Sequence, residues 1–194
     1  GRIPAFDVRE VEARLAAAAR RWDDDLREAL IDARGEALGN ELFLRFGGAL
    51  PVGYRAEFGA RAAVPDIELM AKLSAAAPLG MSLYRPLEAE AGMLRFKLFH
   101  LGAPVTMSDG LPMLERMGLR VIDERPHRVS PPGEPPVWVH DFGVQTAPAD
   151  ADVDVHRLHA VFEDAFGRIF RGEVENDDFN RLVVAARIPA TEIV

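Results

Sequence analysis

The sequence has 194 residues, of which 48% are hydrophobic, and its formal net charge at pH 7 is −8. That size and apolar content suit either one globular domain of ordinary size or one compact domain with a sizeable appendage, and they exclude a disordered chain. Cysteine is absent, which excludes disulfides, thiolate catalysis and cysteine-based zinc sites, and the acidic balance disfavours nucleic acid as the main partner.

The first 75 residues predict an all-helical segment. Apolar residues recur at intervals of three and four over residues 7–34, which indicates a long helix with Asp7 as its cap and Gly35 at its end. The shorter helices predicted next are one around Leu38 to Phe46 that Gly47 ends, one over residues 51–58, and one over residues 66–75 capped around Pro65 and Asp66.

After Gly80 the sequence predicts short strands and helices. Alternating apolar residues favour strands, and a run with helical spacing between Ser108 and Gly118 favours a short helix. The predicted elements are strands 81–85 and 93–101, a helix 109–117 capped by Ser108, a strand 119–129 in which Leu119, Val121 and Asp123 share a face, a strand 137–146, a helix 153–171, and a last helix that begins at Asp177 or Asp178 and stops before Pro189.

The order strand, helix, strand, strand, helix from residue 93 is a ferredoxin-like series without its final strand. A hairpin from 81–85 into 93–101 places the missing strand antiparallel beside the first. We therefore predict an α+β fold, a four-stranded antiparallel sheet with two helices on one face, preceded by an all-helical segment. The expected domains are residues 1–78 (helical), 79–174 (α+β) and 175–194 (a C-terminal helix).

Two groups of side chains are candidates for chemistry. His156 and His159 lie three residues apart on a predicted helix near Asp152 and Glu163, a spacing that suits a metal, but no third ligand is in register and we predict no metal site. The second group lies on predicted strands and comprises Asp123, Glu124, His140 and Asp141. It could perform acid–base work in a stand-alone ferredoxin-like enzyme if the side chains converge, whereas the ordinary interpretation is salt bridges and solvent-facing positions.

Aromatic residues on the predicted strands raise a third possibility, an RNA-binding module. The residues are Phe96, Phe99, Trp138, His140 and Phe142. Phe96 shares its alternation with Leu94 and Leu98, which marks a core position, and the acidic balance opposes binding to RNA.

A series of blocks in the same order resembles a known family. The blocks are Leu83–Pro86, Leu94–Phe99, Ser108–Asp109 with Leu111–Pro112, Met117–Glu124, Trp138–Phe142, Phe162–Phe166 and Phe179–Val183. They resemble the very large bacterial NAD-specific glutamate dehydrogenases, in the N-terminal regulatory half that holds an ACT-like module ahead of the catalytic domain. The Gly-rich dinucleotide loop of a catalytic domain does not occur in this sequence.

The resemblance implies a parent enzyme that oxidatively deaminates L-glutamate to 2-oxoglutarate with NAD. For this fragment it implies no catalytic, cofactor-binding or metal-binding residue. The chain, which has no initiator methionine, is expected to be a cytoplasmic piece that packs on other domains and on further copies, without nucleic acid or membrane partners. An amino-acid effector, if one binds, is expected at the loop that contains Gly102, Thr106, Ser108, Asp109 and Gly110.

Overall fold

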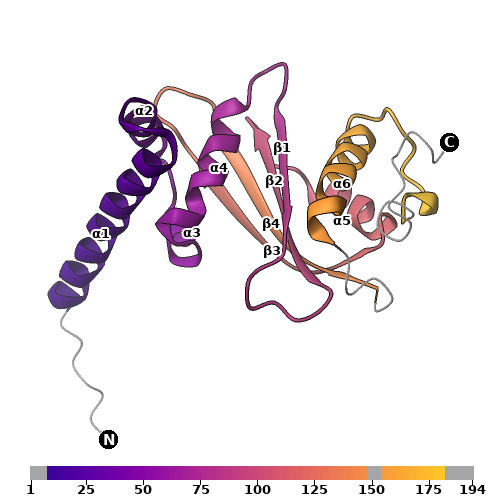
Figure 1. Ribbon diagram of the computed structural model, residues 1–194, viewed down its shortest axis with the longest axis horizontal. Coiled ribbons are helices and arrows are strands. Elements are labelled where there is room, and N and C mark those ends of the chain that lie inside the picture. Colours follow the sequence, from indigo (N-terminus) through magenta and orange to yellow (C-terminus); the bar gives the residue numbers. More distant parts are fainter. Residues whose placement is uncertain (1–7, 148–153, 182–194) are drawn as a thin grey trace, which may run out of the picture. The chain divides into compact units, whose positions relative to one another are not determined.

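The computed structural model describes residues 8–147 and 154–181 (Figure 1). The chain divides into two compact units. The first, called the helical unit below, comprises residues 1–72 and 129–134, and the second, the α+β unit, comprises residues 73–128 and 135–194.

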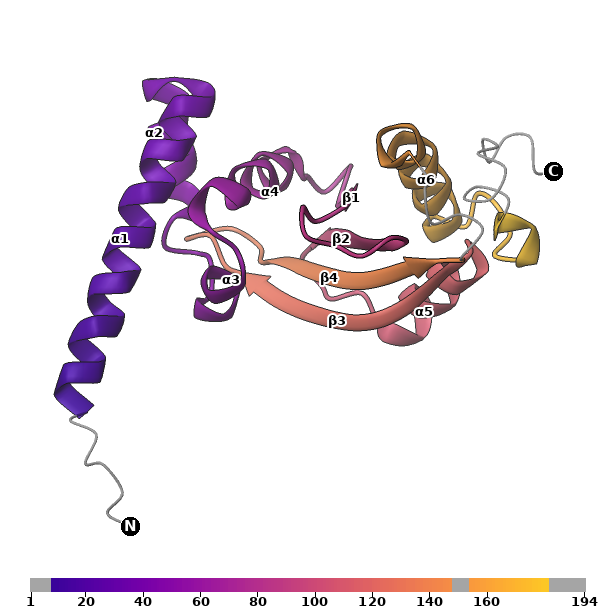
Figure 2. The same cartoon turned by 60° about the horizontal axis from the view of Figure 1, so that its bottom comes forward.

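The helical unit confirms the predicted run of helices. Its helices are α1 (Val8–Arg34), α2 (Glu36–Phe46), α3 (Val52–Glu57) and α4 (Ala60–Lys72). Gly35, with φ of 81°, forms the one-residue link between α1 and α2, which lie side by side in Figure 2. A Cβ at Gly39 would lie 2.6 Å from the Cα of Ile31, so α1 and α2 approach each other where only glycine fits. The predicted cap Asp7 lies outside the described residues.

The start of α4 corrects the prediction of a helix capped at Pro65 and Asp66. The helix begins at Ala60, and Pro65 lies inside it. Proline removes only one backbone hydrogen bond there, and the buried face of the helix offsets this cost. Asp66 is not a cap, because its side chain is buried and accepts a hydrogen bond from the Tyr54 hydroxyl.

The α+β unit has the predicted strand and helix order. Its elements are β1 (Leu79–Tyr84), β2 (Met93–Leu101), α5 (Met107–Arg116), β3 (Leu119–Val129), β4 (Val137–Thr146), α6 (Val155–Phe170) and the 3₁₀ turn η2 (Asp178–Arg181). The sheet order is β1-β2-β4-β3, and β2 runs antiparallel to both β1 and β4. The hairpin of β1 and β2 thus supplies the strand that a ferredoxin-like fold places beside its first strand, which confirms the predicted fold class.

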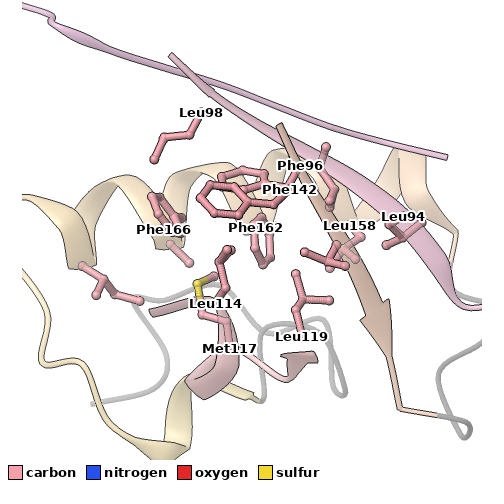
Figure 3. Close-up of a cluster of buried hydrophobic side chains, with 14 of the residues drawn as sticks. Leu94, Phe96, Leu98, Leu114, Met117, Leu119, Phe142, Leu158, Phe162 and Phe166 are labelled. Carbon is pink, nitrogen blue, oxygen red and sulfur yellow. The ribbon is translucent and has the colours of Figure 1, made fainter. Parts of the chain in front are cut away.

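Helices α5 and α6 cover one face of this sheet and enclose an aromatic core (Figures 1 and 3). Phe96 of β2 lies at its centre, with ring centroids 5.3 Å from Phe162 and 5.0 Å from Phe166 of α6. Leu114 and Met117 close the core from the α5 side (Figure 3). These residues are fully buried, as their alternating and helical spacings predict.

Glu163 of α6 protects the outer edge of the sheet. Its Oε1 accepts a hydrogen bond from the backbone N–H of Leu83 at 3.1 Å. This N–H points away from β2, so without the carboxyl group it would be open to pairing with another strand. Burial raises the pKa of the Glu163 carboxyl, against the lowering effects of His159 and of the Leu83 N–H.

The predicted cap of α5 needs correction, and the last predicted helix lies partly outside the described residues. Helix α5 begins at Met107 with Thr106 at its N-cap, so Ser108 lies inside the first turn, while Gly118, with φ of 86°, follows the helix as predicted. Of the predicted last helix, the described part is the single turn η2, and the rest lies outside the described residues.

The alternation in β3 also differs from the prediction. Leu119 and Val121 face the helices, but Asp123 bonds to Arg95 on the opposite face, and Glu124 reaches His140 on the helix-covered face. The side-chain phase has shifted by one residue after Val121, which is the mark of a β-bulge. Sequence alternation carries no signal for such an insertion.

Candidate functional site

The predicted effector loop joins β2 to α5 at one end of the sheet. Gly102 turns the chain with φ of 90°, and its N–H donates to the Pro136 carbonyl at 2.7 Å. His100 Nδ1 lies 2.8 Å from the Ala103 carbonyl oxygen, and the Val105 N–H donates to His140 Nε2 at 3.1 Å. The loop is therefore fixed by contacts from β2 and β4 as well as by its own turn.

The predicted loop residues do not all reach the surface. Gly102, Thr106, Ser108 and Asp109 are exposed, while Gly110 is buried, and a Cβ added there would lie 3.7 Å from Val105 and 3.9 Å from Phe142. Gly110 therefore lies beneath the exposed part of the loop, and its place in the predicted effector site, which the resemblance implies, stays a prediction.

The start of α5 carries the polar groups of the loop. The Thr106 hydroxyl donates to Asp109 Oδ2 at 2.5 Å and lies 3.0 Å from the Ser108 hydroxyl. Thr106 makes no side-chain capping bond to the backbone. Backbone N–H groups at the first turn of a helix favour a carboxylate, and the Asp109 carboxylate favours an ammonium group. The chemistry at this end of α5 therefore suits both ends of a free amino acid.

His140 lies on the helix-covered face of the sheet, next to the loop. Its ring is 5% exposed, and its Nδ1 is 2.7 Å from Oε1 of Glu124 on β3. The rings of Trp138 and Phe142 are stacked beside it with centroids 6.5 and 6.2 Å away. Sequence reasoning singled out His140 and Glu124 as charged residues but missed that one backbone amide of the loop depends on His140.

A separate charged cluster occupies the opposite face of the sheet. Arg95 pairs with Asp141, Nη2 to Oδ2 at 2.8 Å, and with Asp123, Nη1 to Oδ1 at 2.8 Å. Burial lowers the pKa of the Arg95 guanidinium, but hydrogen bonds and charge attraction from the two carboxylates outweigh it and raise the pKa overall. Gly143 makes room for this cluster, since a Cβ there would lie 2.6 Å from Asp123 Oδ2.

This geometry decides the acid–base hypothesis. Asp123 and Asp141 bind Arg95 on one face, whereas His140 lies on the other face with Glu124. The group does not converge in one pocket, as a stand-alone enzyme would need. The predicted salt bridges are present, but the expectation of solvent-facing positions is wrong for His140 and Asp141, which are buried. Arg95 was missed as a partner, although it alternates with core residues on β2.

The other two candidates were the histidine pair on α6 and the aromatic residues on the strands, and neither is arranged as its function would need in the described residues. His159 Nε2 lies 3.9 Å from Glu163 Oε1, while Asp152 and the side chain of His156 lie outside the described residues. Among the described residues, no group of three His, Asp and Glu side chains is placed to hold a metal ion. Phe96, Phe99 and Phe142 are buried, so their rings are not offered to bases.

A depression in the described part of the α+β unit lies away from the predicted loop. It has a volume of about 670 Å³ and adjoins the C-terminal end of α5 and the last residues of β4. Its polar side chains come from Glu115, Arg120, Gln145 and Thr146, and the rest of its lining is small or apolar. Nothing in the sequence pointed to this place.

Comparison with known proteins identifies relatives of this chain. Residues 29–73 match the family model described as "Glutamate dehydrogenase, helical motif 2", and residues 78–158 match "Glutamate dehydrogenase, ACT3 domain". A NAD-specific glutamate dehydrogenase from Halomonas elongata is 42% identical over 188 residues, which cover 97% of this chain and 12% of the relative. The enzyme of that name from Pseudomonas aeruginosa is 38% identical over the same shares.

A more distant relative of the same name, from Mycobacterium tuberculosis, is 29% identical over 204 residues, which cover 98% of this chain and 12% of the relative. Sheet order and family models together define an ACT-like α+β module with a helical motif before it. The chain belongs to the NAD-specific glutamate dehydrogenase family, as the resemblance in its sequence indicates, and spans 12% of the length of the curated relatives it matches. Within the described residues, no helix has the length and apolar character needed to span a membrane.

Proposed function

We propose that this chain is a non-catalytic structural and regulatory segment of an NAD-specific glutamate dehydrogenase. The whole enzyme oxidatively deaminates L-glutamate to 2-oxoglutarate in the cytoplasm, and NAD binds in a part of it that lies beyond this chain. The segment packs against other domains of the same polypeptide and takes part in a homo-oligomer. The observation that carries the proposal is the ACT-like sheet in a chain aligned over 97% of its length with these enzymes.

The side chains with catalytic potential support a non-catalytic role. Asp123 and Asp141 are both paired with Arg95, and His140, which bonds to Glu124, holds the loop. Groups held in this way lack a reacting partner or a cofactor loop beside them. They stabilise the sheet and its loop.

The regulatory part of the proposal rests on the loop between β2 and α5. An amino-acid effector would place its carboxylate against the first-turn N–H groups of α5 and its ammonium group beside Asp109. Thr106 and Ser108 provide hydroxyl groups at the same exposed corner. Gly102 shapes the turn, and Gly110 packs beneath it.

Isothermal titration calorimetry of the chain with each protein amino acid tests this function, together with sedimentation analysis of its oligomeric state. We expect a saturable heat for at least one amino acid, lost in Asp109→Asn. Asp164→Asn, an exposed carboxylate on α6 away from the loop, serves as the matched control and should bind as the wild type does. Absence of heat in a dimeric sample would leave the structural role alone, and absence of heat in a monomeric sample would contradict both parts.

A further inference from the structure

Two imidazoles hold the loop between β2 and α5, one from each of two neighbouring strands. His100 of β2 contacts the Ala103 carbonyl through Nδ1 at 2.8 Å, and His140 of β4 contacts the Val105 N–H through Nε2 at 3.1 Å. The two contacts are two residues apart in the loop. Because one loop partner is an acceptor and the other a donor, the two rings respond to protons in opposite ways.

The hydrogen-bond network assigns the tautomer of each ring. A carbonyl oxygen only accepts, so His100 carries a proton on Nδ1. The Val105 N–H only donates, so His140 Nε2 is bare and its single proton sits on Nδ1, directed at Glu124 Oε1 at 2.7 Å. His140 is therefore neutral whenever it holds the loop.

A second proton on His140 has one place to go. It must enter at Nε2, the atom that accepts from the Val105 N–H, and two N–H groups would then face each other. The ring is 5% exposed and stacked between Trp138 and Phe142, so it cannot turn its new N–H to water without displacing its surroundings. His100 keeps its bond when protonated, because Nδ1 is a donor in both states.

We propose that His140 is a proton-operated latch on the loop: the neutral ring holds Val105, and the imidazolium releases it. Glu124 accepts the Nδ1–H, so Nε2 is the only ring nitrogen left for a second proton. The titratable groups that contact the latch or its loop are Glu124 from β3, which bonds to His140, His100 from β2, which contacts Ala103, and Asp109 from α5, which bonds to Thr106. Helix α6 contributes the apolar ring of Phe170, 6.0 Å from His100.

The latch links pH to the site of the proposed function. This link rests on the proposed function. When His140 is protonated, the affinity of the loop for an amino-acid effector should fall, because the first turn of α5 loses its contact with the ring. The latch itself needs no effector. Its test can therefore be made without ligand, and its failure is distinct from the failure of effector binding.

Nuclear magnetic resonance of the 194-residue chain, from about pH 5 to about pH 8, gives the direct test. Ring ¹⁵N shifts should show His140 as the Nδ1–H tautomer at the upper end of that range. The protection of the Val105 amide, relative to an unstructured amide at the same pH, should fall roughly tenfold or more as the ring titrates, the effect of losing one buried hydrogen bond. An Nε2–H tautomer, or protection that does not change across the titration, would overturn the latch.

Variants separate the latch from a merely structural role. His140→Gln should abolish the pH dependence of Val105 protection, while His100→Gln and the exposed His159→Gln should retain it. Glu124→Gln should weaken the preference of His140 for the Nδ1–H tautomer, because the carboxylate that accepts this proton is lost. An unchanged tautomer preference in Glu124→Gln contradicts the proposal even if His140→Gln fails to fold.

Discussion

The interactions that stabilise the two units of this chain differ. The α+β unit encloses a continuous cluster of aromatic and aliphatic side chains around Phe96. In the helical unit, polar contacts join the apolar faces: the Tyr54 hydroxyl bonds to buried Asp66, and Arg55 donates to the carbonyls of Leu50 and Gly47 at 3.0 and 2.7 Å. The spacing of apolar residues in the sequence predicts the apolar core, but it does not predict the polar contacts.

Each unit carries one of the two tryptophans, so the comparison can be measured unit by unit. Trp22 in α1 donates to the Phe58 carbonyl at 3.0 Å, and Trp138 lies in β4 beside His140. The single-tryptophan variants Trp138→Phe and Trp22→Phe make fluorescence report on the helical unit and on the α+β unit respectively. Urea unfolding of these backgrounds is the measurement for the first three predictions.

The largest effect is expected from Phe96→Ala in the aromatic core. Removing this fully buried ring should lower the free energy of unfolding by about 3–5 kcal/mol, from lost burial and the cavity left behind. The Trp138 transition should shift further than the Trp22 transition. Leu87→Ala, at a fully exposed position, is the control and should leave both unchanged. Equal shifts of both transitions would mean that the units do not unfold as separate bodies.

Tyr54→Phe should destabilise the helical unit more than the α+β unit, the opposite of Phe96→Ala. The substitution keeps the ring in the core of the helical unit and removes the hydroxyl that donates to the buried side chain of Asp66, at a cost of about 1–3 kcal/mol. The Trp22 transition should shift and the Trp138 transition should not. Val52→Ala, on the exposed side of α3, is the control. A cost below the error of the measurement would show that the polar contact does not hold the helical unit together.

Gly143→Ala tests whether the charged face of the sheet depends on space over β4. The new Cβ would lie 2.6 Å from Asp123 Oδ2 and 2.9 Å from Arg95 Nη1, so the ion pair must move, at a cost of about 1–3 kcal/mol. Gly48→Ala is matched, because nothing lies within 4 Å of its Cβ position. Asp123→Ala combined with Gly143→Ala should cost less than the sum of the single changes, and additive costs would contradict the packing argument.

The smallest effect concerns Glu163 and depends on pH. Burial raises the pKa of its carboxyl above the ordinary value of 4.5, so the folded protein holds this proton to higher pH than the unfolded chain does. The resulting stabilisation is complete below the ordinary pKa and is lost as pH rises through the raised one. Between about pH 4 and about pH 7, wild type should therefore lose stability relative to Glu163→Gln. Asp164→Asn, at an exposed position on the same helix, is the control. A stability difference between wild type and Glu163→Gln that stays constant over this pH range would contradict the prediction.

Much of the fold could be predicted because apolar spacing determines which residues are buried. Strands β2, β3 and β4 have the predicted bounds, while β1 is Leu79–Tyr84 where residues 81–85 were predicted. The hairpin of β1 with β2 was predicted from the ferredoxin-like order of the elements. Pro65 misled the prediction because proline is common in first turns, whereas here the packing of α4 tolerates it inside the helix.

The candidate site was harder to predict. The contact of His140 with Val105 joins residues 35 apart, and the partners of Arg95 depend on a bulge in β3. Periodicity contains no information on either, because both depend on strand register and on side chains that cross between strands. The residues were visible as charged positions, but their partners were not.

A whole enzyme can show directly whether this segment regulates without taking part in catalysis. In the Halomonas elongata glutamate dehydrogenase, the aligned segment of 188 residues is replaced by this chain, either as wild type or as Asp109→Asn. We predict that both chimaeras reduce NAD with glutamate at similar turnover without added effector, and that Asp109→Asn alters only the response to other amino acids. Loss of turnover in the Asp109→Asn chimaera, with its assembly intact, would contradict a structural and regulatory role for this segment.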